Sequence, residues 1–177
     1  MAVVAACQVP VDIDDPVKTR RIVAEAVAEA AARGAELVVL PELTVCGSIW
    51  RDVAESSARA EAVTGPSVEL FRALSREHGV VVVGGFCEVS GLDKPYNSAV
   101  VVDGGEVLAV YRKTHLWDTE KLHFTPGDAL PPVVPTRVAV ATAMFFCAAR
   151  SRWVGNRVPA TSRPARMSAA ISSTRGR

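Results

Sequence analysis

Two charged residues stand where apolar segments end, and both could take part in catalysis. Glu42 closes the apolar run in LPEL, and Lys113 follows another apolar run and opens KTHLWDTEKLHFTPG, which is dense in polar and aromatic residues. Polar groups at the strand ends of open α/β sheets reach the crevice where ligands bind. Each residue alone favours an ordinary surface role. Together with a cysteine thiol they would supply a carboxylate base, a cation and a nucleophile for acyl transfer.

A thiol with its ordinary pKa of about 8.5 needs a neighbouring base or cation before it attacks an amide carbon efficiently at neutral pH. The chain has four cysteines, none in a CxxC pair, and its histidines show no ligand spacing, so we expect no metal site. We expect no cofactor either, because neither a phosphate loop nor a dinucleotide motif is present. Cys7, Cys46 and Cys87 lie in apolar runs or beside Glu42, where buried inert thiols are expected.

The segments around these residues alternate between strand and helix patterns. Short apolar runs predict strands in AVVAACQV, ELVVLPE and GVVVVGGFCEV. Two amphipathic helices are expected between them, one capped by Asp15 and ended by Gly34, the other opened by Gly65-Pro66-Ser67. YNSAVVVD and GEVLAVYR then predict an antiparallel hairpin around Gly104-Gly105. This order predicts a layered α/β fold with a mixed sheet covered by helices on at least one face.

Length and composition indicate one globular domain. The chain has 177 residues, of which 49% are hydrophobic and 22% charged, and this excludes a disordered or low-complexity protein. A net charge of +1 is too balanced to indicate nucleic acid or an anionic membrane as a partner. The sequence contains no apolar run of about 18 residues and no signal-peptide pattern, so we expect a cytoplasmic protein.

The charge distribution changes towards the C-terminus. No acidic residue follows Asp128, whereas residues 129–177 contain eight arginines. Another strand-like run covers 138–146, but beyond Cys147 the hydrophobic periodicity fails, so we expect a domain over 1–147 and an Arg/Ser/Ala-rich coil over 148–177. Such a tail could bind nucleic acid through its cations. Its single aromatic residue and its lack of helical spacing argue against that function.

Several stretches resemble the nitrilase superfamily of carbon–nitrogen hydrolases. They are AACQV, GAELVVLPEL, GGFCE, YNSAVVVD and YRKTHLW with EKLHFTPGD, which cover residues 3–128 in the order typical of that family. The resemblance implies an αββα sandwich, incomplete here at its C-terminus. It also implies that Glu42 is the general base, that Lys113 stabilises the tetrahedral intermediate, and that Glu120 is a second carboxylate orienting Lys113 and the substrate.

The resemblance assigns the nucleophile to Cys147, which ends an apolar run 34 residues after Lys113. The family follows its cysteine with an aromatic residue and Asp, then a Pro-Glu pair. This chain instead has Cys147-Ala148-Ala149-Arg150. We therefore hypothesise that the reading frame or the gene departs from the family between about Arg137 and Cys147.

Three functions follow from these observations as alternatives. The resemblance implies an amidase or N-carbamoyl-amine hydrolase that cleaves a small linear amide through a cysteine thioester, with nitrile hydrolysis as a near alternative. A catalytically inactive, truncated or frameshifted fragment of such an enzyme is the second alternative. A nucleic-acid-binding tail is the third and weakest. The expected partner is a small amide, carbamoyl or nitrile compound, and a homo-oligomer is compatible with the sequence.

Overall fold

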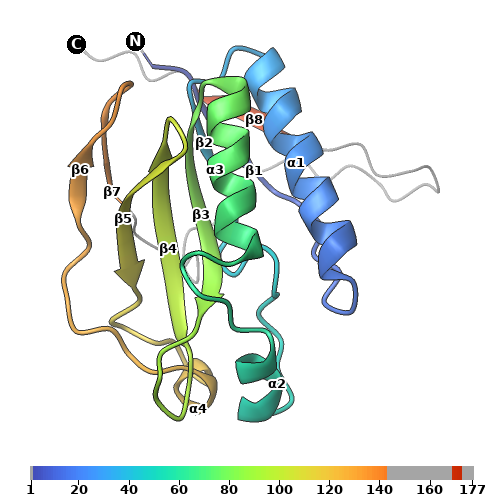
Figure 1. Cartoon of the computed structure of the whole chain (residues 1–177), viewed down its shortest axis with the longest axis vertical. Helices are drawn as coiled ribbons and strands as arrows, with labels where there is room; N and C mark the ends of the chain where they lie inside the picture. The colour runs from blue at the N-terminus through green and yellow to red at the C-terminus, as the bar shows by residue number, and fades with distance from the viewer. Residues whose placement is uncertain (1, 143–168, 173–177) are drawn as a thin grey trace.

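The computed structural model describes residues 2–142 and 169–172, and a mixed β-sheet is its central feature (Figure 1). Within these residues the strand order is β5-β4-β3-β2-β1-β8. Strands β1, β2 and β3 pair in parallel, β4 and β5 continue the sheet antiparallel, and β8 pairs antiparallel with β1. The strands of this sheet are β1 (Val4–Cys7), β2 (Leu37–Val39), β3 (Val81–Glu88), β4 (Tyr96–Asp103), β5 (Glu106–Arg112) and β8 (Ala169–Ser172).

The two long helices begin and end close to where the sequence predicts. Helix α1 (Pro16–Ala32) is capped by Asp15, whose carboxylate accepts a hydrogen bond from the Lys18 backbone N–H at 2.8 Å. Helix α3 (Pro66–His78) begins with proline in its first turn and ends before Gly79, which adopts a left-handed φ of 66°. The short helices are α2 (Val53–Ala58) and α4 (Glu120–His123). No helix in the described part of the chain has both the length and the apolar character needed to cross a membrane.

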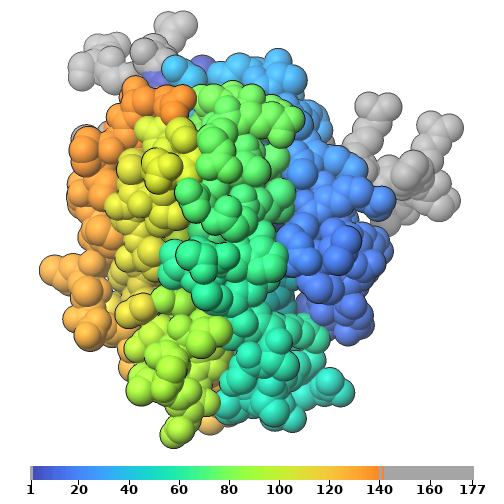
Figure 2. Space-filling view, viewed as in Figure 1, coloured from blue at the N-terminus to red at the C-terminus, as the bar shows by residue number. Residues whose placement is uncertain are grey.

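Helices α1 and α3 cover one face of the sheet and enclose the larger apolar core. The buried side of α1 packs beside α3, and in the space-filling view the two helices lie against each other (Figure 2). Phe71 of α3 is wholly buried, and its ring lies over Gly84 of β3. A Cβ atom at Gly84 would stand 2.7 Å from that ring, so the absence of a side chain there lets the helix approach the sheet.

The opposite face of the sheet packs against a second, two-stranded sheet. Strands β6 (Val133–Pro135) and β7 (Val140–Thr142) form this hairpin. Ala141 of β7 and the partly buried Val134 pack in one apolar cluster with Tyr111 of β5 and Val101 of β4. The described layers are therefore helix, sheet and sheet, which agrees with the layered α/β fold expected from the sequence. The second helix layer of an αββα sandwich is not among the described residues.

One element lies in the stretch for which the composition predicts coil. Residues Ala169–Ser172 form β8 and pair with Val4–Cys7 at the edge of the sheet. The segment Ala-Ala-Ile-Ser contains small and β-branched residues that are compatible with a strand, and β1 offers an edge with unpaired backbone groups. Its three apolar residues, 169–171, are too few for hydrophobic periodicity to predict a strand. The remainder of 148–177 lies outside the described residues.

The contact between Phe71 and Gly84 gives a test of this core. We expect Phe71→Ala to lower the free energy of unfolding by about 3–5 kcal/mol, because it leaves a cavity between α3 and the sheet. Urea denaturation followed by circular dichroism measures the change. Leu122→Ala is the control, because that side chain is 62% exposed and should change the stability by about 0.5 kcal/mol or less. Equal effects of the two variants would contradict the packing described.

Candidate active site

The buried amine of Lys113 stands between two carboxylates. Lys113 follows the last residue of β5, and only 7% of its side chain is exposed. Its Nζ atom donates to Glu42 Oε1 at 2.8 Å and to Glu120 Oε1 at 2.9 Å, and it also lies 2.8 Å from Glu120 Oε2. The structure thus brings together three of the four residues that the sequence singled out. The fourth, Cys147, lies outside the described residues.

The two carboxylates keep Lys113 in its charged form. Burial has the largest single effect on the Lys113 pKa and lowers it, because a buried ammonium loses its hydration. The hydrogen bonds from Lys113 to Glu120 and Glu42, with the charges of both carboxylates, together outweigh burial and raise the pKa above the ordinary lysine value. At neutral pH the site therefore holds a protonated amine next to two carboxylate groups.

Glu42 reaches the site from a tight turn that follows β2. The next residue, Leu43, has a left-handed φ of 49° although it is not glycine, and its side chain is buried. Gly85 of β3 lies directly under this turn: a Cβ atom there would stand 2.6 Å from the Leu43 backbone nitrogen and 2.9 Å from Glu42 Cα. The Gly85 carbonyl accepts a hydrogen bond from the Thr44 N–H at 3.1 Å. A strained turn held by its neighbours is typical of a functional position.

The Glu120 side chain is held by backbone as well as by Lys113. Glu120 begins α4, and its Oε2 atom accepts a hydrogen bond from the Trp117 N–H at 2.7 Å. Its side chain is 19% exposed, compared with 31% for Glu42. Glu42 is thus the more accessible carboxylate, and Glu120 is the more firmly fixed.

Asn97 is a residue of the site that the sequence did not indicate. Asn97 lies on β4, is wholly buried, and donates from Nδ2 to Glu42 Oε1 at 2.7 Å and to Glu120 Oε1 at 3.2 Å. Its backbone carbonyl accepts the Lys113 N–H at 2.8 Å. The available signal was a polar residue followed by apolar ones in YNSAVVVD, which by itself is also typical of the start of an ordinary strand.

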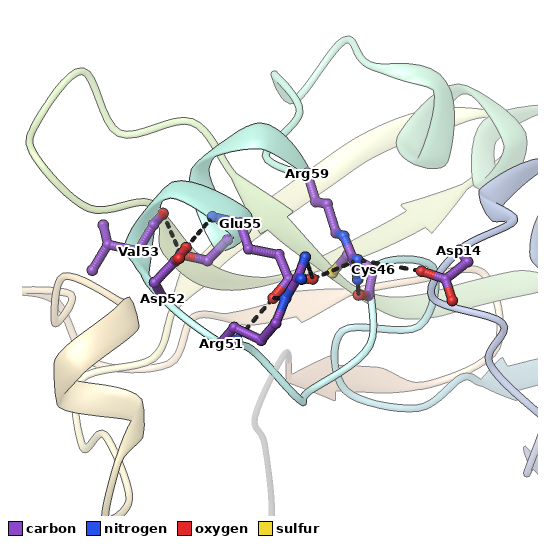
Figure 3. A network of polar contacts seen from close by, with 8 residues as sticks. Asp14, Cys46, Arg51, Asp52, Val53, Glu55 and Arg59 are labelled. Carbon is purple, nitrogen blue, oxygen red and sulfur yellow. Dashed lines mark hydrogen bonds and ion pairs between the residues drawn. The ribbon is translucent and has the colours of Figure 1, made fainter.

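A polar network supports the segment that follows Glu42 (Figure 3). The Glu55 carboxylate accepts hydrogen bonds from the Arg51 N–H and from Arg59 Nη2, both at 2.8 Å. Arg59 Nη1 also donates to the Cys46 carbonyl at 3.4 Å, and Asp52 caps α2 through the Glu55 N–H. These contacts connect the end of the Glu42 turn to α2. The conformation of the turn is therefore braced from outside the site.

The three described cysteines have the buried surroundings that the sequence predicts. Burial and the nearby charge of Glu29 raise the pKa of the Cys7 thiol. The pKa of Cys87 is raised far above its usual range by its contact with the Cys46 thiol and by burial. Cys46 and Cys87 belong to one apolar cluster with Leu43 and Phe124. A thiol with a raised pKa is a poor nucleophile at neutral pH, so neither Cys7 nor Cys87 is suited to attack a substrate.

The chain is similar in sequence to known carbon–nitrogen hydrolases. The profile of the carbon-nitrogen hydrolase family matches residues 3–158. The chain is 37% identical over 129 residues to a nitrilase of Pyrococcus abyssi, which corresponds to 72% of this chain and 49% of the relative. It is 40% identical over 127 residues to the human deaminated glutathione amidase, which corresponds to 68% of this chain and 38% of the relative. The chain therefore spans less than two thirds of the length of either relative.

Solved structures give the same result for the fold. An amidase from Nesterenkonia sp. AN1, solved with acrylamide added at its active-site cysteine, superposes with a TM-score of 0.66 at 25% sequence identity. The alignment covers 80% of this chain and 56% of that amidase. The described sheet and its helices thus correspond to about half of a known amidase.

The raised pKa of Lys113 predicts a defined dependence of stability on pH. We expect Lys113→Met to lower the free energy of unfolding by about 3 kcal/mol near pH 7, because two partly buried carboxylates lose their cation. A lysine whose pKa is higher in the folded than in the unfolded state stabilises the protein at pH values below its unfolded-state pKa. This stabilisation is lost as the pH rises towards the folded-state pKa. The difference between wild type and variant should therefore hold up to about pH 10 and shrink above it.

Urea denaturation at a series of pH values measures this difference. Lys121→Met is the matched control, because that side chain is exposed and should change the stability little at any pH. If the difference in free energy of unfolding between wild type and Lys113→Met grows between pH 10 and pH 11, the pKa of Lys113 is not raised in the folded protein.

Proposed function

This chain belongs to the carbon-nitrogen hydrolase family, and from that membership we propose that it hydrolyses a small linear amide or an N-carbamoyl amine through a thioester on Cys147. The observation that carries the proposal is the contact of one protonated amine with two carboxylates, Glu42 and Glu120. This cluster places a carboxylate that can act as a base next to a cation that can stabilise an oxyanion, and acyl transfer to a thiol requires both. The human relative and the superposed Nesterenkonia protein are amidases, so we propose amides as the first substrate class, with nitriles as the alternative because the Pyrococcus abyssi relative is a nitrilase.

In the first half of the proposed reaction, Glu42 accepts the thiol proton while the Cys147 sulfur attacks the substrate carbonyl carbon. The resulting oxyanion is stabilised by the ammonium of Lys113. The proton on Glu42 then passes to the leaving nitrogen, the carbon–nitrogen bond breaks, and ammonia or an amine departs. The acyl group remains on sulfur as a thioester.

In the second half, Glu42 removes a proton from water as the water oxygen attacks the thioester carbon. The carbon–sulfur bond breaks, the acid is released, and the thiolate takes back the proton from Glu42. Glu120 keeps Lys113 in place throughout, because it contacts Nζ with both carboxylate oxygens. The greater exposure of Glu42 suits a group that must exchange protons with substrate and water.

Ammonia release from a panel of small amides tests the proposal. We expect hydrolysis by the wild type, a loss of about 100-fold or more in kcat for Glu42→Gln, and no measurable turnover for Cys147→Ala. An electrophilic substrate analogue should label Cys147 in the intact chain, as determined by mass spectrometry of its peptides. Cys7→Ser is the control, because that thiol is buried and its loss should leave the labelling unchanged.

A folded chain that neither turns over amides nor becomes labelled at Cys147 would overturn the proposal. The circular dichroism spectrum establishes that the chain is folded. That result would favour the alternative of a catalytically inactive fragment of a carbon–nitrogen hydrolase. Turnover of nitriles in place of amides would retain the family chemistry and change the substrate class.

A further inference from the structure

The side chain of Asn97 joins the two carboxylates through the same oxygens that Lys113 contacts. Its Nδ2 atom lies 2.7 Å from Glu42 Oε1 and 3.2 Å from Glu120 Oε1, the same two oxygens that accept from Lys113 Nζ. Each of these oxygens therefore receives one hydrogen bond from an ammonium and one from an amide. The four groups form a closed ring of donors and acceptors.

The ring carries one excess negative charge, and a neutral donor can stabilise it without changing that charge. Glu42 and Glu120 carry two negative charges against the single positive charge of Lys113, and two carboxylates side by side repel each other. A second cation would neutralise this excess negative charge, which the carboxylate of Glu42 needs in order to act as a base. The amide of Asn97 supplies two N–H groups with no charge, so it can satisfy both carboxylates and leave the net charge of the site unchanged.

The orientation of the amide follows from the same contacts. If the group were reversed, its oxygen would face two carboxylate oxygens, which can only accept hydrogen bonds when ionised. In the observed orientation, Asn97 Oδ1 is buried and has no hydrogen-bond partner among the described residues. An unpaired buried acceptor is unfavourable, so the two hydrogen bonds that the amide nitrogen donates must outweigh it.

The described surroundings offer no substitute for these donors. Among residues 2–142, the side chain of Glu42 has hydrogen bonds only from Lys113 and Asn97. The neighbouring polar groups lie on the other face of the sheet, where Ser98 of β4 and Arg112 of β5 both donate to Glu88 of β3. Trp117 contacts only the far oxygen of Glu120.

We propose that Asn97 is a positioning residue that holds Glu42 and Glu120 together against Lys113 and thereby aims the base at the substrate. This inference rests on the proposed function for its catalytic consequence, but its structural part concerns the ring alone. Without the amide, the repulsion between the two carboxylates should drive one of them away from the lysine. Lys113 then loses a partner, and Glu42 loses its fixed orientation.

The titration of Lys113 tests the ring without any need for activity. The pKa of its amine is measured by NMR of carbon-13 at Cε in lysine-labelled full-length protein, and the signal is identified by its loss in Lys113→Arg. Asn97→Leu keeps a similar shape without donors, and we expect it to lower the Lys113 pKa by at least one unit, because burial is then opposed by fewer carboxylate contacts. Asn97→Val also removes both donors and has a side chain that suits a strand, so we expect it to lower the Lys113 pKa as well.

Ser98→Ala is the matched control. It removes a buried hydrogen bond from the adjacent residue of the same strand but on the opposite face, so it should reduce stability and leave the Lys113 pKa unchanged. In the activity assay, Asn97→Leu should reduce kcat about 100-fold with little change in KM, because the base is misplaced and the substrate pocket remains.

Unchanged Lys113 pKa values in both Asn97 variants, with a loss of stability like that of Ser98→Ala, would show a purely structural residue and overturn the inference. If Asn97→Leu does not fold, the Lys113 pKa in the smaller variant Asn97→Val decides the question alone. A wild type that is inactive but shows the predicted pKa shifts would refute the proposed function and leave the ring intact.

Discussion

The site depends on the cost of burying one charge. A lysine that is 7% exposed would give up its proton if it stood alone, because the ammonium loses its hydration. Two carboxylates at 2.8 Å and 2.9 Å reverse that tendency and raise the Lys113 pKa. The stability of the site and its proposed chemistry therefore rest on the same contact, since the interaction that keeps Lys113 charged also keeps it in the form that the proposed contact with an oxyanion requires.

The sheet supplies the precision that this contact needs. Glu42 follows β2, Asn97 lies in β4, Lys113 follows β5, and Glu120 starts α4, so the cluster joins four separate segments. Strand β3 pairs with both β2 and β4, and this pairing sets the separation of Glu42 and Asn97. The backbone N–H of Lys113 donates a hydrogen bond to the Asn97 carbonyl. Small shifts between strands would break contacts of under 3 Å. The rigid layer of α1 and α3 behind the sheet opposes such shifts.

The turn after β2 shows how packing and chemistry constrain each other. Leu43 adopts a left-handed conformation that is unfavourable for its side chain type, and Gly85 is the residue that lets the turn approach the sheet. The polar network of Arg51, Glu55 and Arg59 holds the following segment (Figure 3). The strain at Leu43 is thus offset by contacts that contribute nothing to the reaction itself.

The sequence by itself determined the elements and the residue types available for chemistry. Caps and periodicity located α1, α3 and the β4–β5 hairpin, because those signals are local, and strand-end positions identified Glu42 and Lys113. Only the tertiary structure decided that these two residues meet, that Asn97 joins them, and that residues 169–172 add a strand beside β1. Such contacts depend on strand pairing across dozens of residues, and no local pattern contains that information.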